Sequence, residues 1–179
     1  MTDKIIFDNP WLKVKESPHG YIFSERKGVD SIAILAYTKM GNDIEILTRF
    51  QPLPFKNAEN KEDTLPLFCC PITGSIDKGD TADDSAIKEM KEEAGYEITK
   101  DQLTYLGYYI VGTQTNEAVH MYIIDVTNLE PAETSSDGTY HESVSENFWH
   151  KLDFIENNCE YAGLVILINK LKKYLEDNK

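Results

Sequence analysis

Three glutamates, Glu89, Glu92 and Glu93, are spaced so that a single helix would bring their carboxylates together. At about 100° per residue, Glu89 and Glu93 lie one above the other and Glu92 lies beside them. Like charges at these spacings repel one another unless a cation neutralises them. Because oxygen ligands on a rigid backbone suit Mg²⁺ or Mn²⁺, the spacing predicts a divalent-metal site built for phosphate chemistry.

Boundary signals on both sides indicate where this helix begins and ends. Asp80 and Thr81 are typical of a helix entry, and Asp83 and Asp84 place negative charge in its first turn. Gly95 is expected in the left-handed conformation that ends a helix. An apolar stripe packs one flank of the helix and leaves the acids beside the core. It consists of Ala86, Ile87, Met90 and Ala94.

The alternative is an ordinary solvated helix, on which Lys88 and Glu92 form a surface pair worth about 0.3 kcal/mol. The residues ahead of the helix argue against this alternative, because a strand and the glycines Gly74 and Gly79 lead into it. The whole segment, residues 74–96, is GSIDKGDTADDSAIKEMKEEAGY.

This segment resembles the signature box of the Nudix hydrolases, which has Gly, Glu, Arg-Glu, Glu-Glu and Gly at these spacings. Asp80 stands where the family has Glu, and Lys88 stands where it has Arg. The resemblance implies that this acid and this base brace the loop against the helix, here as a shorter contact without the paired geometry of arginine.

The likeness extends beyond the box and looks strongest to the ADP-ribose and nucleoside-diphosphate-sugar pyrophosphatase group. It is carried by RKGVDSIAILAY (26–37), ILTRFQPLPF (46–55) and the approach to the box at 65–74. It implies an α/β Nudix fold, with a mixed β-sheet sandwiched between helices. It also implies an N-terminal β-hairpin extension over residues 1–28, through which two copies form a homodimer.

Hydrophobic alternation predicts the strands around the box. We expect a hairpin at 11–16 and 21–26, and strands at 31–37, 44–50, 103–111, 119–126 and 146–150. Residues 51–66 and 130–145 are expected as loops. The segment 161–175 is expected as an amphipathic helix, with Leu164, Ile168, Leu171 and Leu175 on one face.

Length and composition limit the remaining possibilities. A chain of 179 residues with 41% hydrophobic residues is most simply one domain, residues 1–179. The net charge of −13 argues against a nucleic-acid partner, because no basic stripe is present. No stretch is long and apolar enough for a membrane span, so a cytoplasmic location is expected. Cys69, Cys70 and Cys159 have no metal-ligand spacing and are expected as buried, reduced thiols.

The resemblance implies a reaction, namely hydrolysis of the pyrophosphate bond in a nucleoside diphosphate linked to a group X, such as ADP-ribose or a nucleotide sugar. Mg²⁺ or Mn²⁺ would be bound by Glu89, Glu92, Glu93 and the backbone carbonyl of Thr73, with Glu92 and Glu93 as catalytic residues. The group's general base is a glutamate in a late mobile loop, and Glu142 is the candidate here. Glu146 is the alternative in the same segment, and both acids could instead be solvated.

Three further residues are candidate substrate contacts. Arg49 ends a strand where its planar fork could grip phosphate oxygens, although an ordinary surface role is the alternative. Glu117 resembles a loop position that faces substrate in relatives. Tyr21, with Phe23, could stack on a base, although aromatic residues in strands more often belong to a core.

The substrate stays open because Pro52 replaces a second arginine of the group, and Tyr109-Ile110 stand where the group has a proline. One alternative is a pyrophosphatase that sanitises nucleoside triphosphates. Another is a module that binds a nucleotide metabolite without hydrolysing it. The intact Glu89, Glu92 and Glu93 favour an enzyme over this module.

Overall fold

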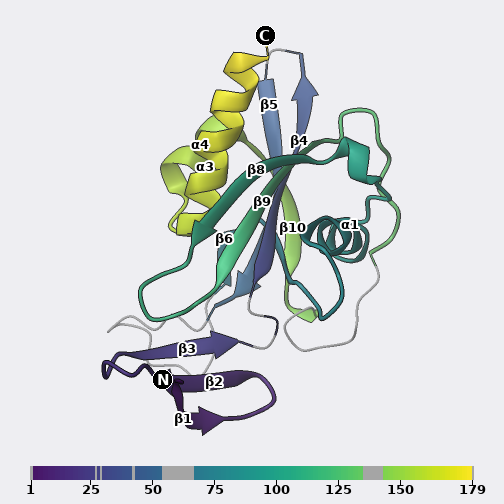
Figure 1. Ribbon diagram of the computed structural model, residues 1–179. Helices are drawn as coiled ribbons and strands as arrows, with labels where there is room; N and C mark the ends of the chain where they lie inside the picture. The colour runs from purple at the N-terminus through teal and green to yellow at the C-terminus, as the bar shows by residue number, and fades with distance from the viewer. Residues whose placement is uncertain are drawn as a thin grey trace.

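The structure is a computed structural model, and it describes residues 2–26, 28, 30–41, 43–53, 67–134 and 143–178. Figure 1 shows the arrangement of its elements. In chain order these are β1 (Lys4–Asp8), β2 (Leu12–Glu16), β3 (Ile22–Arg26), β4 (Ser31–Met40), β5 (Asp43–Pro52), β6 (Leu67–Cys70), β7 (Ile72–Ser75), α1 (Ala82–Glu92), the 3₁₀ turn η1 (Lys100–Gln102), β8 (Thr104–Ile110), β9 (Ala118–Asp125), β10 (Glu146–Lys151), α3 (Leu152–Asn158) and α4 (Ala162–Asp177).

A seven-stranded mixed sheet forms the centre of the molecule, in the order β10-β5-β4-β9-β8, with β6 paired to β5 and β7 paired to β4. Strands β4 and β9 run parallel, while β4 pairs with β5 and β7 in antiparallel fashion. Helix α1 covers one face of this sheet, and α3 and α4 cover the other (Figure 1). The expected mixed sheet between helices is therefore confirmed.

Strand β4 supplies both faces of the core, because successive side chains of a strand point in opposite directions. Ile32, Ile34 and Ala36 belong to the buried cluster beneath α1. Ala33 and Leu35 belong to the cluster beneath α3 and α4. A strand buried on both faces needs an unbroken apolar run, and SIAILAY provides one.

A second sheet lies apart from these two clusters and contains the three strands β1, β2 and β3. The predicted hairpin corresponds to β2 and β3, which pair from Leu12 with Arg26 to Glu16 with Ile22. Strand β1 was not predicted, because its consecutive Ile5, Ile6 and Phe7 do not alternate with polar residues. A register shift between Ile5 and Phe7 accompanies that irregular pattern.

The remaining differences are local. The seven-residue helix α3 was missed because it is short and buries only Leu152 and Ile155. The stretch before the box divides into β6 and β7 on either side of Pro71. Most of the loop expected at 51–66 and part of that at 130–145 lie outside the described residues. Among the described residues, no helix has the length and apolarity to cross a membrane.

Candidate active site

Helix α1 begins and ends as its sequence indicates. The hydroxyl of Thr81 accepts a hydrogen bond from the backbone N–H of Asp84, and the Asp84 carboxylate accepts one from the Thr81 backbone. At the other end Gly95 has φ +78°, and the Tyr96 N–H donates to the Met90 carbonyl across it. Both ends are therefore fixed by local hydrogen bonds, while Ala86 and Met90 pack the helix on the sheet.

The carboxylate of Glu89 lies directly against Gly74 of strand β7. A Cβ atom placed on Gly74 would overlap the Cγ, Cδ and Oε1 atoms of Glu89. The glycine that opens the box is therefore required by packing, because any side chain there would displace the acid. Thr73, the residue before it, pairs with Ala33 of the central strand. This contact joins the acidic helix to the backbone of the sheet.

Glu93 is held by residues from two neighbouring strands. The Nε of Arg49 in β5 lies 3.3 Å from Glu93 Oε1, and both side chains are largely buried, with 8% and 14% exposure. The Nη1 of Arg49 donates to Asn147 Oδ1, and Asn147 Nδ2 donates to the Glu93 carbonyl. A buried ion pair of this kind fixes geometry more reliably than it adds stability. Arg49 therefore orients Glu93 in this structure, and its expected phosphate contact stays a prediction.

The solvated-helix alternative does not fit the burial of the acids, since Glu89, Glu92 and Glu93 are all half-buried. Lys88 lies 3.7 Å from Asp77, both side chains being at least half exposed. The expected brace between Lys88 and Asp80 is therefore replaced by a looser contact with Asp77.

The donor chemistry around the helix fits a hard divalent cation, because the candidate ligands are all oxygens. The contact of Glu89 with Gly74 also places one carboxylate next to the residue that follows Thr73 in β7. Within the part of the chain that the structure describes, no three His, Cys, Asp or Glu side chains are grouped closely enough to hold a metal ion together. The four-ligand metal site stays a prediction.

A cavity of about 520 Å³ adjoins the box strand. Its lining includes Thr73 and Gly74, the predicted substrate contact Glu117, and the aromatic rings of Tyr109 and Tyr161. Burial raises the pKa of both tyrosines above the ordinary value, so their hydroxyls stay protonated at neutral pH. The three acids of α1 do not line this cavity, which meets the box at Thr73 and Gly74.

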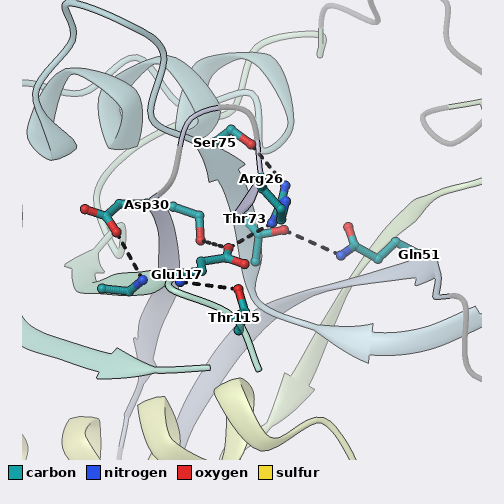
Figure 2. A network of polar contacts seen from close by, with 9 residues as sticks. Arg26, Asp30, Gln51, Thr73, Ser75, Thr115 and Glu117 are labelled. Atoms are coloured by element: carbon teal, nitrogen blue, oxygen red, sulfur yellow. Dashed lines mark hydrogen bonds and ion pairs between the residues drawn. The ribbon is translucent and has the colours of Figure 1, made fainter. Parts of the chain in front are cut away.

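A hydrogen-bond network links several residues that line this cavity (Figure 2). Glu117 Oε1 accepts from Arg26 Nη1 at 2.8 Å and from Ser31 Oγ at 2.6 Å. Arg26 Nη2 also donates to Ser75 Oγ at 3.2 Å. The network therefore joins the N-terminal sheet, the central strand and the box strand.

The other predicted site residues are placed as follows. Tyr21 is 48% exposed, and its hydroxyl donates to the Thr113 carbonyl rather than facing the cavity. Glu142 lies outside the described residues, while Glu146 is exposed at the start of β10.

The three cysteines are free thiols, and burial raises the pKa of Cys70 to about 12, so it stays protonated.

Sequence reasoning missed two residues of the site, Arg26 and Asn147. Arg26 was predicted as the end of a strand and belongs to a segment that carries the family resemblance, but no spacing relates it to Glu117, which lies 91 positions later. Asn147 gave no signal, because its contact with the end of α1 depends on the register between β10 and β5.

Comparison with known proteins agrees with this geometry. Residues 41–163 match the model of the NUDIX domain, and the chain belongs to the Nudix family. It is 30% identical over 146 residues to an uncharacterized Nudix hydrolase of Schizosaccharomyces pombe. That match covers 77% of this chain and 65% of the yeast protein, so the chain spans less than two thirds of its relative.

Two solved structures share the fold. An Ap4A hydrolase of C. elegans, crystallised as a binary complex, is 22% identical with a TM-score of 0.55, and the match covers 83% of this chain and 98% of that one. A structure described as an ADP compounds hydrolase is 15% identical with a TM-score of 0.64, and the match covers 99% of this chain and 94% of that one. At these identities the likeness establishes the Nudix fold alone.

Proposed function

We propose that the protein is a metal-dependent Nudix pyrophosphohydrolase that cleaves a nucleoside diphosphate linked to X, such as ADP-ribose or a nucleotide sugar. The observation that carries this proposal is the contact of Glu89 with Gly74, which sets the acidic helix beside a cavity of about 520 Å³. The names of the two structural neighbours, an Ap4A hydrolase and an ADP compounds hydrolase, support a nucleotide substrate.

The acidic helix and its strands have distinct roles in this proposal. Glu89, Glu92 and Glu93, with the Thr73 carbonyl, would bind Mg²⁺ or Mn²⁺. Such an ion, when bound, draws charge from phosphate oxygens and lowers the pKa of water. Arg49 orients Glu93, because its guanidinium is buried beside that carboxylate.

Other segments would provide proton transfer and bind the uncharged part of the substrate. Glu142, which lies outside the described residues in the part of the sequence between β9 and β10, is proposed as the general base. The neutral hydroxyls of Tyr109 and Tyr161 line the cavity and suit an uncharged part of the substrate.

We also propose that two copies pair through the N-terminal sheet. This sheet exposes several apolar side chains, namely Ile5, Ile6, Phe7, Trp11 and Ile22. Apolar groups gathered on one small sheet are typical of an interaction surface. Sedimentation equilibrium should give the mass of a dimer at micromolar concentration, and a monomer mass would contradict this part of the proposal.

Replacement of Glu93 by Gln tests the catalytic role. With Mg²⁺ saturating, the change should lower kcat by roughly 100-fold or more, the size expected when one preorganised charge beside the reacting group is lost. Glu97→Gln is the matched control, because Glu97 is exposed and pairs only with Lys91 on the surface. Thermal unfolding of each variant separates lost activity from lost folding. A loss of only a few-fold in kcat would count heavily against the proposal.

A substrate panel tests the class of reaction. ADP-ribose, a nucleotide sugar and a deoxynucleoside triphosphate should be compared with Mg²⁺, with Mn²⁺ and with chelator, scored by the nucleotide released. Release of nucleoside monophosphate from the first two is the expected result. Preferential turnover of the triphosphate would instead favour a sanitising enzyme, and binding without turnover would favour a sensor.

A further inference from the structure

We infer that Arg26 and Ser31 are positioning residues, which hold one oxygen of Glu117 so that its other oxygen binds a hydroxyl group of the substrate. This inference rests on the proposed function for the identity of the ligand, a nucleoside diphosphate bearing a ribose or another sugar. It assigns a role in the site to two residues that lie outside the box at residues 74–96.

Both donors bind the same oxygen of Glu117. Arg26 Nη1 donates to Oε1 at 2.8 Å, and Figure 2 shows Arg26 directed at Glu117. Ser31 Oγ donates to the same oxygen at 2.6 Å. The Glu117 side chain is only 9% exposed, and its backbone N–H donates to Thr115 Oγ1. Two donors on one oxygen fix the direction of a carboxylate, because rotation about the side chain would break both bonds.

The second oxygen, Oε2, accepts no hydrogen bond from any described residue. A half-satisfied carboxylate at the wall of a cavity is costly unless water or a ligand donates to it. An ionised carboxylate only accepts, so its ligand must carry a hydroxyl or amino hydrogen.

The charges around the cavity narrow the choice of ligand group. Among the described lining residues, Arg26 is the one base and Glu117 the one acid, and they neutralise each other. The rest of the lining is uncharged, including Tyr109, Tyr161 and Gln51. A cavity of this composition suits a neutral group rich in hydroxyls, whereas a phosphate would meet the negative carboxylate of Glu117.

Arg26 also explains how the N-terminal sheet takes part in the site. It is the last residue of β3, and its second nitrogen donates to Ser75 at the end of the box strand. The guanidinium therefore spans from Glu117 to the box with two separate N–H groups, which a lysine could not do.

Equilibrium binding of ADP-ribose, measured by calorimetry with chelator present, tests this inference without requiring turnover. Arg26→Gln and Ser31→Ala should each weaken binding by about tenfold, the size of one lost charge-assisted contact. Arg26→Lys should recover part of the affinity because it keeps one donor. Lys4→Gln is the matched control, since Lys4 lies in the same sheet and pairs with Glu16, and neither residue lines the cavity.

A double-mutant cycle with Glu117→Gln separates positioning from a merely structural role. If Arg26 acts through Glu117, Arg26→Gln should add less than twofold in the Glu117→Gln background. Additive losses, or wild-type affinity in both Arg26→Gln and Ser31→Ala, would overturn the inference. A wild-type protein that binds ADP-ribose but hydrolyses no substrate would refute the proposed enzyme and leave this inference standing.

Discussion

The seven-stranded sheet and the three-stranded N-terminal sheet differ in what holds them together. The larger sheet lies between two buried clusters, and among the described residues neither cluster contains one before Ile32. In the smaller sheet, every side chain of β1, β2 and β3 is exposed or half-buried. Small sheets need an apolar face packed on another element for independent stability, so the N-terminal sheet depends on its neighbours.

The contacts between the two regions are polar and gather on β3. The backbone of Ser24 exchanges hydrogen bonds with Gln114 and Asn116 in the loop between β8 and β9. Arg26 and Tyr21 add the contacts with Glu117 and Thr113. Hydrophobic burial thus fixes the larger sheet and the acidic helix, while directional hydrogen bonds dock the smaller sheet onto the cavity.

The largest expected difference between the regions is in the cost of removing an apolar side chain. Leu164→Ala empties a fully buried site in the core and should lower the free energy of unfolding by about 2–5 kcal/mol. In the monomer, at concentrations below those at which two copies pair, Ile6→Ala should change it by less than about 0.5 kcal/mol, because that residue is 50% exposed. Urea unfolding measures both. Equal costs would mean that the N-terminal sheet is buried in the protein in solution.

A smaller effect is expected where helix α1 meets the sheet. Tyr122 is 2% exposed, and its hydroxyl donates to Asp83 at 2.7 Å. Tyr122→Phe keeps the packing and removes one hydrogen bond to a charged acceptor, which should cost about 1.5 kcal/mol. Urea unfolding is again the measurement. An unchanged midpoint would show that packing alone holds this end of the helix.

The same contact predicts a pH dependence. Two hydrogen bonds lower the pKa of Asp83 below its ordinary value of 3.8. The bond from Lys100 has the larger effect and the bond from Tyr122 the smaller one. The unfolded chain therefore takes up this proton first as the pH falls, and acid favours unfolding. The stability difference between wild type and Asp83→Asn should be full at pH 7 and shrink below pH 3.8. A difference that is constant down to pH 3 would contradict the assignment.

The smallest effect is expected within the N-terminal sheet itself. Lys15 pairs with Glu25 across β2 and β3, and this contact lowers the pKa of Glu25. Lys15→Gln should cost less than about 1 kcal/mol. Hydrogen exchange should show faster opening of β2 and β3, with no change in β4 or α1. Faster exchange throughout the chain would mean that the two sheets open together.

The sequence predicted the box helix and the central strands well because their signals are local. Thr81 and Gly95 mark the ends of α1 through hydrogen bonds within a few residues. The unbroken apolar run of β4 identifies a strand buried on both faces. Strand β1 was not predicted because its apolar and polar residues do not alternate. Helix α3 was not predicted because it has only seven residues.

The polar network of the site could not be predicted in the same way. Arg26 meets Glu117, and Arg49 meets Glu93, only because the chain folds distant segments together. Strand register decides such pairs, and a shift of one residue would turn each side chain to the other face. The box spacing indicated the acids, but it carried no information about the residues that orient them.

Because Glu89 lies against Gly74, adding one methyl group at this position would move a single carboxylate. Alanine at this position would evict the Glu89 carboxylate while every ionisable group of the protein stays present. Gly74 is one residue of the cavity lining, whereas the hydrogen bonds of Arg26 and Ser31 to Glu117 involve none of its atoms and stay present. The alanine variant offers a form suited to capturing an uncleaved ligand from a metabolite mixture, so that the natural substrate can be identified directly.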